Sequence, residues 1–112
     1  MIETLLIKHA VGGRTFVDSG KEPVAYLAQA NGDVWTFAIE VTYGQTIEEL
    51  LKWRKELNVF LFQTDETGER PVTKIWFYVN EDTVRYDLSG QRLTFEAKSR
   101  IVYVPDSFGY KL

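Results

Sequence analysis

Few side chains in this chain of 112 residues could carry out acid–base, nucleophilic or metal chemistry. The chain holds one histidine, His9, and no cysteine. Histidine is the side chain whose ordinary pKa suits a general base near neutral pH, but no partner acid for His9 is evident in the sequence. Without cysteine there is no thiolate nucleophile and no Cys-based zinc site, and no serine lies in a G-x-S-x-G motif. The sequence therefore predicts no catalytic residue, no metal site and no cofactor.

Glu40 and Arg54 are the candidates for a polar ligand pocket. Glu40 lies in a predicted strand, on its less apolar face, where partial burial would make the carboxylate seek a cation. Arg54 falls among apolar residues when positions 46–57 are placed on a helix at about 100° per residue. It could keep its guanidinium in water while its stem is buried, pair with a carboxylate such as Glu40, or bind an anionic ligand. Together with His9, these two residues form the predicted ligand-binding set.

An aromatic surface is the candidate for contact with a partner. Trp76 and Tyr78 alternate with apolar residues and therefore face the opposite side of a predicted strand. Lys74 lies on the same side, and Arg85 and Arg92 come from a hairpin predicted to follow. Aromatic side chains edged by Lys and Arg are typical of protein hot spots and of base-stacking sites. If both faces of the sheet are covered, however, Trp76 and Tyr78 are core residues instead.

The segment TIEELLKWRKEL, residues 46–57, is the one clear helical pattern in the chain. Ile47 and Leu50 lie on one face of this predicted helix, with charged residues opposite them. Thr46 followed by Glu49 predicts a capping box at its start. The helix is therefore expected to pack its apolar face on a sheet.

The most distinct hairpin signal is Asn31-Gly32, the preferred residue pair for a two-residue type I′ turn. Pairing outward from this turn collects apolar side chains on one face, which supports a half-buried antiparallel pair. The predicted partners are Tyr26 with Phe37, Ala28 with Trp35, and Val24 with Ile39.

A second hairpin is predicted about Ser89-Gly90 by the same alternation. One of its faces is apolar and the other is polar, with one favourable charge pair. The predicted partners are Tyr86 with Leu93, Val84 with Phe95, and Asp87 with Arg92.

Further segments, among them RIVYVP at residues 100–105, complete the predicted sheet. Residues 2–10 fit strand and helix spacing alike, and the paired glycines Gly12-Gly13 with the β-branched content favour a strand. Residues 58–64 are apolar on both faces, as in a central strand. In residues 72–80, the apolar residues Ile75, Phe77 and Val79 alternate with Lys74, Trp76 and Tyr78, as in a strand with two different faces.

The order of elements predicts one α+β domain over residues 1–112. Its mainly antiparallel, curled sheet is expected to have about eight strands, with the helix between the fourth and fifth and packed on the sheet. A single helix excludes a doubly wound sheet and leaves no strand–Gly-rich turn–helix unit for phosphates.

Composition limits the classes of partner. The chain is 45% hydrophobic and 26% charged, with a net charge of −3, so it has the makeup of a soluble globular domain without the basic excess of nucleic-acid-binding domains. No run approaches the roughly 18 apolar residues of a membrane span, and the first residues lack the pattern of a signal peptide. A cytoplasmic location is expected.

These observations favour a non-catalytic binding or accessory module that acts through protein–protein contacts. The alternative is a small-ligand-binding β-barrel-like protein or minor enzyme, with a polar pocket around Glu40 and Arg54. A third hypothesis, single-stranded nucleic-acid binding, rests on the aromatic and arginine residues and is weakened by the negative net charge.

Overall fold

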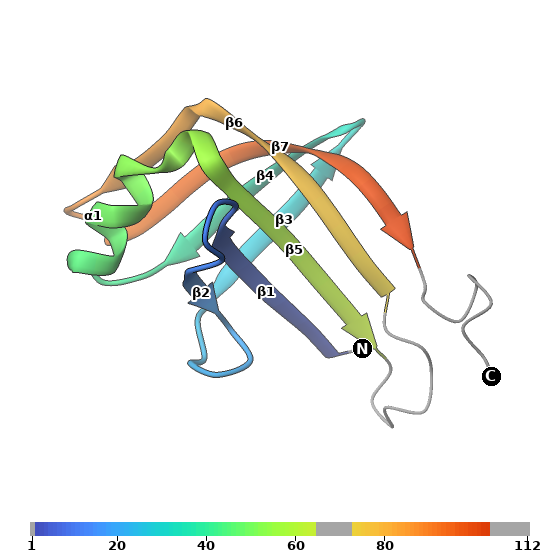
Figure 1. Cartoon of the computed structure of the whole chain (residues 1–112), viewed down its shortest axis with the longest axis horizontal. Helices are drawn as coiled ribbons and strands as arrows, with labels where there is room; N and C mark the ends of the chain where they lie inside the picture. Colours follow the sequence, from blue (N-terminus) through green and yellow to red (C-terminus); the bar gives the residue numbers. More distant parts are fainter. Residues whose placement is uncertain (1, 65–72, 104–112) are drawn as a thin grey trace.

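The structure, a computed structural model, describes residues 2–64 and 73–103. Seven strands, one α-helix and one short 3-10 helix follow one another along this part of the chain (Figure 1). Their bounds are β1 (Ile2–His9), β2 (Thr15–Asp18), β3 (Tyr26–Asn31), β4 (Val34–Glu40), α1 (Gln45–Lys52), η1 (Arg54–Glu56), β5 (Leu57–Thr64), β6 (Thr73–Asp87) and β7 (Arg92–Tyr103).

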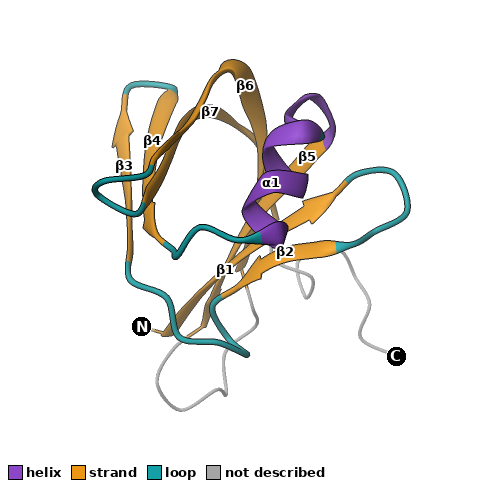
Figure 2. Ribbon diagram, turned by 90° about the vertical axis from the view of Figure 1, so that its left-hand side faces the viewer, coloured by secondary structure: helices purple, strands orange, loops and turns teal. Residues whose placement is uncertain are grey.

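The strands form a single antiparallel sheet in the order β2-β1-β5-β6-β7-β4-β3. Figure 2 shows the sheet curling around an interior, with α1 at the end of the curl that faces the viewer. This arrangement confirms the predicted α+β fold with a curled antiparallel sheet and a helix between the fourth and fifth strands.

The described chain has seven strands where about eight were expected, because the C-terminal strands are long. Residues 73–87 form the continuous strand β6, which passes through an irregularity between Asn80 and Arg85 instead of ending there. The second hairpin pairs as predicted at its turn, with Asp87 opposite Arg92 and Tyr86 opposite Leu93.

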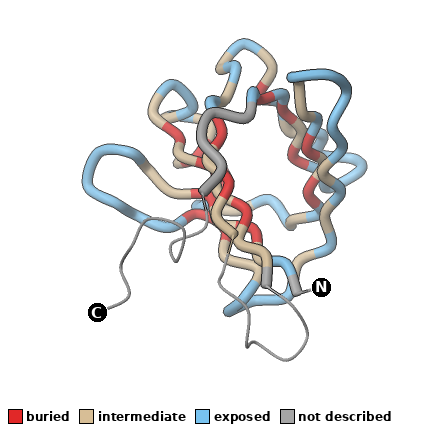
Figure 3. Tube along the Cα trace, turned by 90° about the vertical axis from the view of Figure 1, so that its right-hand side faces the viewer, coloured by how far each residue is buried: buried red, intermediate tan, exposed pale blue. Residues whose placement is uncertain are grey.

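Side chains that point into the curl form the hydrophobic core. Figure 3 shows buried positions recurring along the strands around the interior. At the centre, the Phe37 ring lies 5.0 Å from the Phe77 ring and 4.9 Å from the Phe95 ring, measured between centroids. Edge-to-face and stacked contacts of this kind add to the free energy of burial. Among the residues that the structure describes, the buried ones are Leu5, Ile7, Phe16, Val17, Phe37, Ile39, Ile47, Leu50, Leu57, Val59, Leu61, Ile75, Phe77, Val84, Leu93, Phe95 and Ala97.

The register of the β3–β4 hairpin differs from the predicted one by two residues. Tyr26 pairs with Ile39 instead of Phe37, and the turn is Gly32-Asp33 instead of Asn31-Gly32. Gly32 has φ 69°, while Asp33 is not among the residues with positive φ, so the turn fits type II′ with glycine first. The side chains still point to the predicted faces of the sheet, because a shift of two residues preserves their alternation.

Residues 2–9 form a strand, as the paired glycines favoured. β1 pairs with β2 through a turn in which Gly12 has φ 87° and Gly13 has φ 72°. β1 also pairs along its whole length with β5, which places residues 58–64 inside the sheet as predicted.

The helix is shorter than the predicted span 46–57. α1 ends at Lys52, a 3-10 turn follows at residues 54–56, and Leu57 already belongs to β5. The predicted capping box is wrong: Gly44 is the N-cap, and no side chain caps the helix. No helix in the described ranges is long and apolar enough to cross a membrane.

Candidate functional site

His9, at the end of β1, lies against the 3-10 turn. Its Nε2 is 2.7 Å from the Oε1 of Glu56, and the ring centroids of His9 and Trp53 are 5.1 Å apart. The ring of Phe16 lies on β2 at 6.2 Å, so the imidazole is mostly enclosed, with 15% of its side chain exposed. This partner acid stands 47 residues away in sequence, which is why the sequence did not reveal it. The pair anchors the end of the sheet to the turn after α1.

An ion pair joins the same two parts of the fold. Arg14, in the β1–β2 connection, donates to the carboxylate of Glu49 on α1 over 2.8 Å. Glu49 therefore contacts the sheet edge rather than capping its own helix. Both pairs explain how a short helix is held over the curl.

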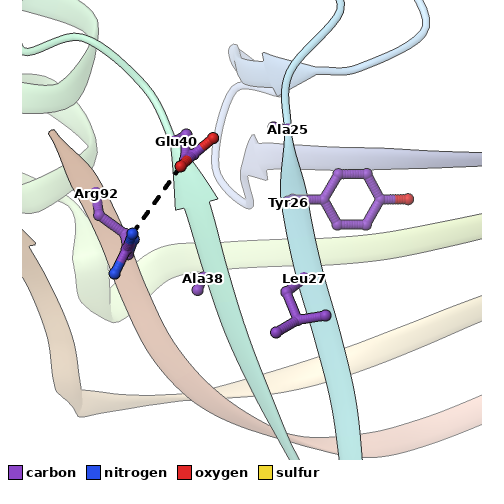
Figure 4. A pocket seen from close by; sticks show the side chains of 6 residues that line it. All are labelled: Ala25, Tyr26, Leu27, Ala38, Glu40 and Arg92. Atoms are coloured by element: carbon purple, nitrogen blue, oxygen red, sulfur yellow. Dashed lines mark ion pairs between the residues drawn. The ribbon is translucent and has the colours of Figure 1, made fainter. Parts of the chain in front are cut away.

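Glu40 lies on the outer face of β4 and approaches Arg92, not Arg54. Its Oε1 is 3.9 Å from an Nη atom of Arg92 on the neighbouring strand β7 (Figure 4). Both side chains are more than half exposed and line an open groove of about 380 Å³ together with Leu27 and Ala38. An exposed ion pair at this distance contributes about 0–1 kcal/mol.

Arg54 points into water, and the reason is the early end of the helix. A wheel drawn at 100° per residue to position 57 places Arg54 on the apolar face, but α1 ends at Lys52. The 3-10 turn that follows rotates the side chain away, so that it is exposed and lies 3.5 Å from the Leu51 carbonyl oxygen. His9 contacts Glu56, Glu40 approaches Arg92, and Arg54 lies near the Leu51 carbonyl oxygen. No hydrogen bond or ion pair therefore joins the three residues of the predicted ligand-binding set, all in the described part of the chain, to one another.

The strands β5 and β6 carry an aromatic surface on the outside of the curl. Trp76 is half-buried and donates through Nε1 to the Asn58 side chain at 3.2 Å, while Tyr78 is 50% exposed. Their rings meet edge to face at 5.9 Å. The Lys74 ammonium lies 4.6 Å from the centroid of the Phe60 ring and 5.7 Å from that of the Phe62 ring. We call Phe60, Phe62, Lys74, Trp76 and Tyr78 the outer aromatic face.

The strand pairing explains why these side chains meet. Phe60 lies directly across from Trp76, and Phe62 across from Lys74. Lys74, Trp76 and Tyr78 were predicted from the sequence as surface residues, but the two phenylalanines were not. Their signal was present, because a strand apolar on both faces must place one apolar set outside whenever only its other face meets the core.

Arg85 and Arg92, predicted to extend this surface, lie further along the same side of the sheet. Arg85 is opposite Thr94, and the irregularity after Asn80 separates it from Tyr78. Arg92 is six residues from Lys98, the partner of Tyr78, which amounts to about 20 Å of strand. The five predicted residues therefore form two groups: Lys74, Trp76 and Tyr78 in one, Arg85 and Arg92 in the other.

Asp87 completes the second group on β6, opposite Arg92. The Ser89 hydroxyl and the Gly90 amide donate hydrogen bonds to its carboxylate, and with a smaller effect of the Arg92 charge they lower the Asp87 pKa. These bonds stabilise the β6–β7 turn.

A groove of about 260 Å³ adjoins the exposed side of Tyr78. It is lined by Val34, Tyr78, Val79, Asn80, Glu96, Ala97 and Lys98. Its walls combine an aromatic ring, aliphatic groups and charges of both signs. Its volume suits a single side chain of a bound segment, and it makes Tyr78 part of a concave site.

Tyr26, Glu3 and Gln63 form a polar bridge that the sequence analysis missed. The Tyr26 hydroxyl donates to Glu3 at 2.7 Å, and the Gln63 amide donates to the other oxygen of the same carboxylate at 2.8 Å. Burial, and secondarily the Glu3 carboxylate, raise the pKa of Tyr26. The bridge links edge strand β3 to β1 across the curl.

Within residues 2–64 and 73–103, no group of three His, Asp or Glu side chains is placed to hold a metal ion. Comparison of the chain with models of protein families, with curated proteins and with solved structures yields no match.

Proposed function

We propose that this chain is a non-catalytic binding module that contacts a partner protein through the outer aromatic face. The observation that carries the proposal is the exposure of Tyr78, 50% in water, beside a groove of about 260 Å³. Tyrosine and tryptophan are enriched among the residues that contribute most of the binding free energy of protein interfaces, and such residues cluster in well-packed pockets.

The physical form of the surface supports a protein partner. Trp76 is already fixed by its hydrogen bond to Asn58, and its contact with Tyr78 restricts both rings. Side chains ordered before binding lose less conformational entropy when a partner arrives. The surface is therefore prepared for contact without a rearrangement of the sheet.

The alternative of a polar ligand pocket has weaker support. Glu40 and Arg92 line the larger groove, but their side chains are 61% and 51% exposed. Water competes with any ligand for such groups, which limits the affinity that their charges can provide. The cytoplasmic location belongs to the proposal as well, since a chain without cysteine has no structural need of an oxidising compartment.

The proposal is tested by selecting binders from a random peptide library displayed on phage, against wild-type protein, Tyr78→Ala and Tyr43→Ala. Tyr43 is the matched control, because it is 42% exposed and its ring lies 5.5 Å from that of Tyr86. Selected peptides should bind wild type and Tyr43→Ala and lose at least tenfold in affinity for Tyr78→Ala. Peptides that bind all three proteins equally, or no enrichment at all, would overturn the proposal.

A titration with oligodeoxythymidylate at low salt distinguishes the nucleic-acid hypothesis from the proposal of a protein partner. Binding that weakens steeply with added salt and depends on Tyr78 would replace the protein partner by a single strand.

A further inference from the structure

A row of four outward side chains crosses the sheet at Tyr78, and its two ends are positively charged. Lys8 on β1 pairs with Asn58 on β5, Asn58 pairs with Tyr78 on β6, and Tyr78 pairs with Lys98 on β7. These positions alternate with the buried positions Ile7, Val59, Phe77 and Ala97, so all four face outward. We call them the lysine-ended row.

The spacing of this row follows from sheet geometry. Adjacent strands lie about 4.8 Å apart, so three steps place the two lysine positions about 14 Å from each other. Neither lysine has an ion pair in the described part of the chain, whose ion pairs involve other residues. Asn58 and Tyr78 lie between the two lysines, and Lys98 also lines the groove beside Tyr78.

Resting on the proposed function, we infer that the partner is an extended acidic segment lying across the strands, with two carboxylates four residues apart and an apolar residue midway. An extended chain advances about 3.3 Å per residue, so four residues span about 13 Å and match the lysine separation. Residues i, i+2 and i+4 of such a segment point to the same side. The outer two therefore meet Lys8 and Lys98. The central one lies about 7 Å from either end, between the Asn58 and Tyr78 positions, and contacts the Tyr78 ring from the Asn58 side.

Charge complementarity selects this occupant. The chain carries a net charge of −3, yet this row carries two cations and no acid. The acid that lines the adjoining groove is Glu96. A basic segment would meet like charge at both ends, and like charges facing each other reduce affinity. A nucleic acid would bring the same sign of charge as the acidic segment, but the chain as a whole lacks a basic excess.

The test uses short blocked peptides that carry a fluorophore and are titrated by anisotropy against the full chain. The probe has two glutamates four positions apart with leucine midway and serines between. Two control peptides are used: one with lysines in place of the glutamates, and one with the glutamates two positions apart. The probe should bind at least tenfold more tightly than either control, and its affinity should fall as salt rises.

Charge-reversed variants of the protein test whether the lysines of the row bind the glutamates of the probe. Lys98→Glu should weaken binding of the glutamate probe about tenfold and strengthen binding of a peptide with lysine at one end. Lys52→Glu, which changes a lysine of α1 outside the row, should change neither affinity. Equal binding of the glutamate and lysine peptides, or binding unaffected by Lys98→Glu, would overturn the inference. If library peptides require Tyr78 but show no preference for acidic residues, the proposed function stands and the inference of an acidic segment is overturned. If oligodeoxythymidylate binds more tightly than the probe, the row binds nucleic acid and the inference is also overturned.

Discussion

Phe77 and Tyr78 are neighbours in β6 that face opposite sides of the sheet, and replacing each by alanine tests the assignment of the two faces. Phe77 is fully buried, at 0% exposure, and its ring contacts Phe37 and Trp35 at 5.0 and 5.1 Å. Removing a buried phenylalanine side chain costs about 3–5 kcal/mol, because the transfer free energy is lost and a cavity remains.

Tyr78 is half exposed, and its substitution should cost much less. Full burial of a large apolar side chain contributes about 1.5–3 kcal/mol, so half of that burial contributes about 1 kcal/mol. We therefore expect Phe77→Ala to lower the free energy of unfolding by about 2–4 kcal/mol more than Tyr78→Ala does.

The assay is urea-induced unfolding followed by tryptophan fluorescence, with m-values compared to establish that the same transition is measured. A domain of this size has a total stability of about 5–15 kcal/mol, so Phe77→Ala takes up a large share of it. Phe77→Leu, which leaves a smaller cavity, is measured in parallel as a variant that stays folded. Equal losses for Phe77→Ala and Tyr78→Ala would refute the reasoning, because they would mean that the outer aromatic face is also core.

Three further predictions concern backbone, helix cap and pH. Gly32→Ala should lower the free energy of unfolding by about 1–2 kcal/mol, because Gly32 has φ 69°; a loss below about 0.5 kcal/mol in urea unfolding would exclude the left-handed turn. Thr46→Ala should lower the same free energy by no more than about 0.5 kcal/mol, below the ~1 kcal/mol of a true cap, since no side chain caps α1; a larger loss would restore the capping box. The raised pKa of Tyr26 favours its protonated form in the folded state, so its contribution is complete below the unfolded pKa of about 10 and is lost as pH rises through the folded value. Stability curves above about pH 10 should therefore fall less steeply for Tyr26→Phe than for wild type, and parallel curves would contradict the bridge to β1.

The periodicity of the sequence determined which strand residues face the core. Phe37, Phe77 and Phe95 were all on predicted apolar faces, and all are buried. Alternation is a local property with a period of two residues, so it remains correct even where the β3–β4 register was two residues off. The fold class followed from the same signal, together with the single helical segment.

Residue partners far apart in sequence depended on the tertiary structure. An ion pair between Glu40 and Arg54 was one of three alternatives that the sequence left open for Arg54, beside an exposed guanidinium and an anionic ligand. In the sheet, β4 lies beside β7, and that neighbour supplies Arg92 to Glu40. His9 contacts its partner acid Glu56 because β1 pairs with β5, and this pairing places the end of β1 beside the start of β5, which Glu56 precedes. Strand order in a curled sheet is set by the packing of the whole core, and no local pattern encodes it.

The end of the helix was also decided by tertiary contacts. The apolar and charged pattern of residues 46–57 continues past Lys52, yet the chain leaves the helix at Trp53, whose ring packs on His9. That departure turned Arg54 from a residue among core positions into an exposed one. The sequence by itself thus determined the faces of the strands and the kind of fold, while strand order, register and the end of the helix were fixed by contacts between distant residues, because only the assembled core distinguishes among locally equivalent choices.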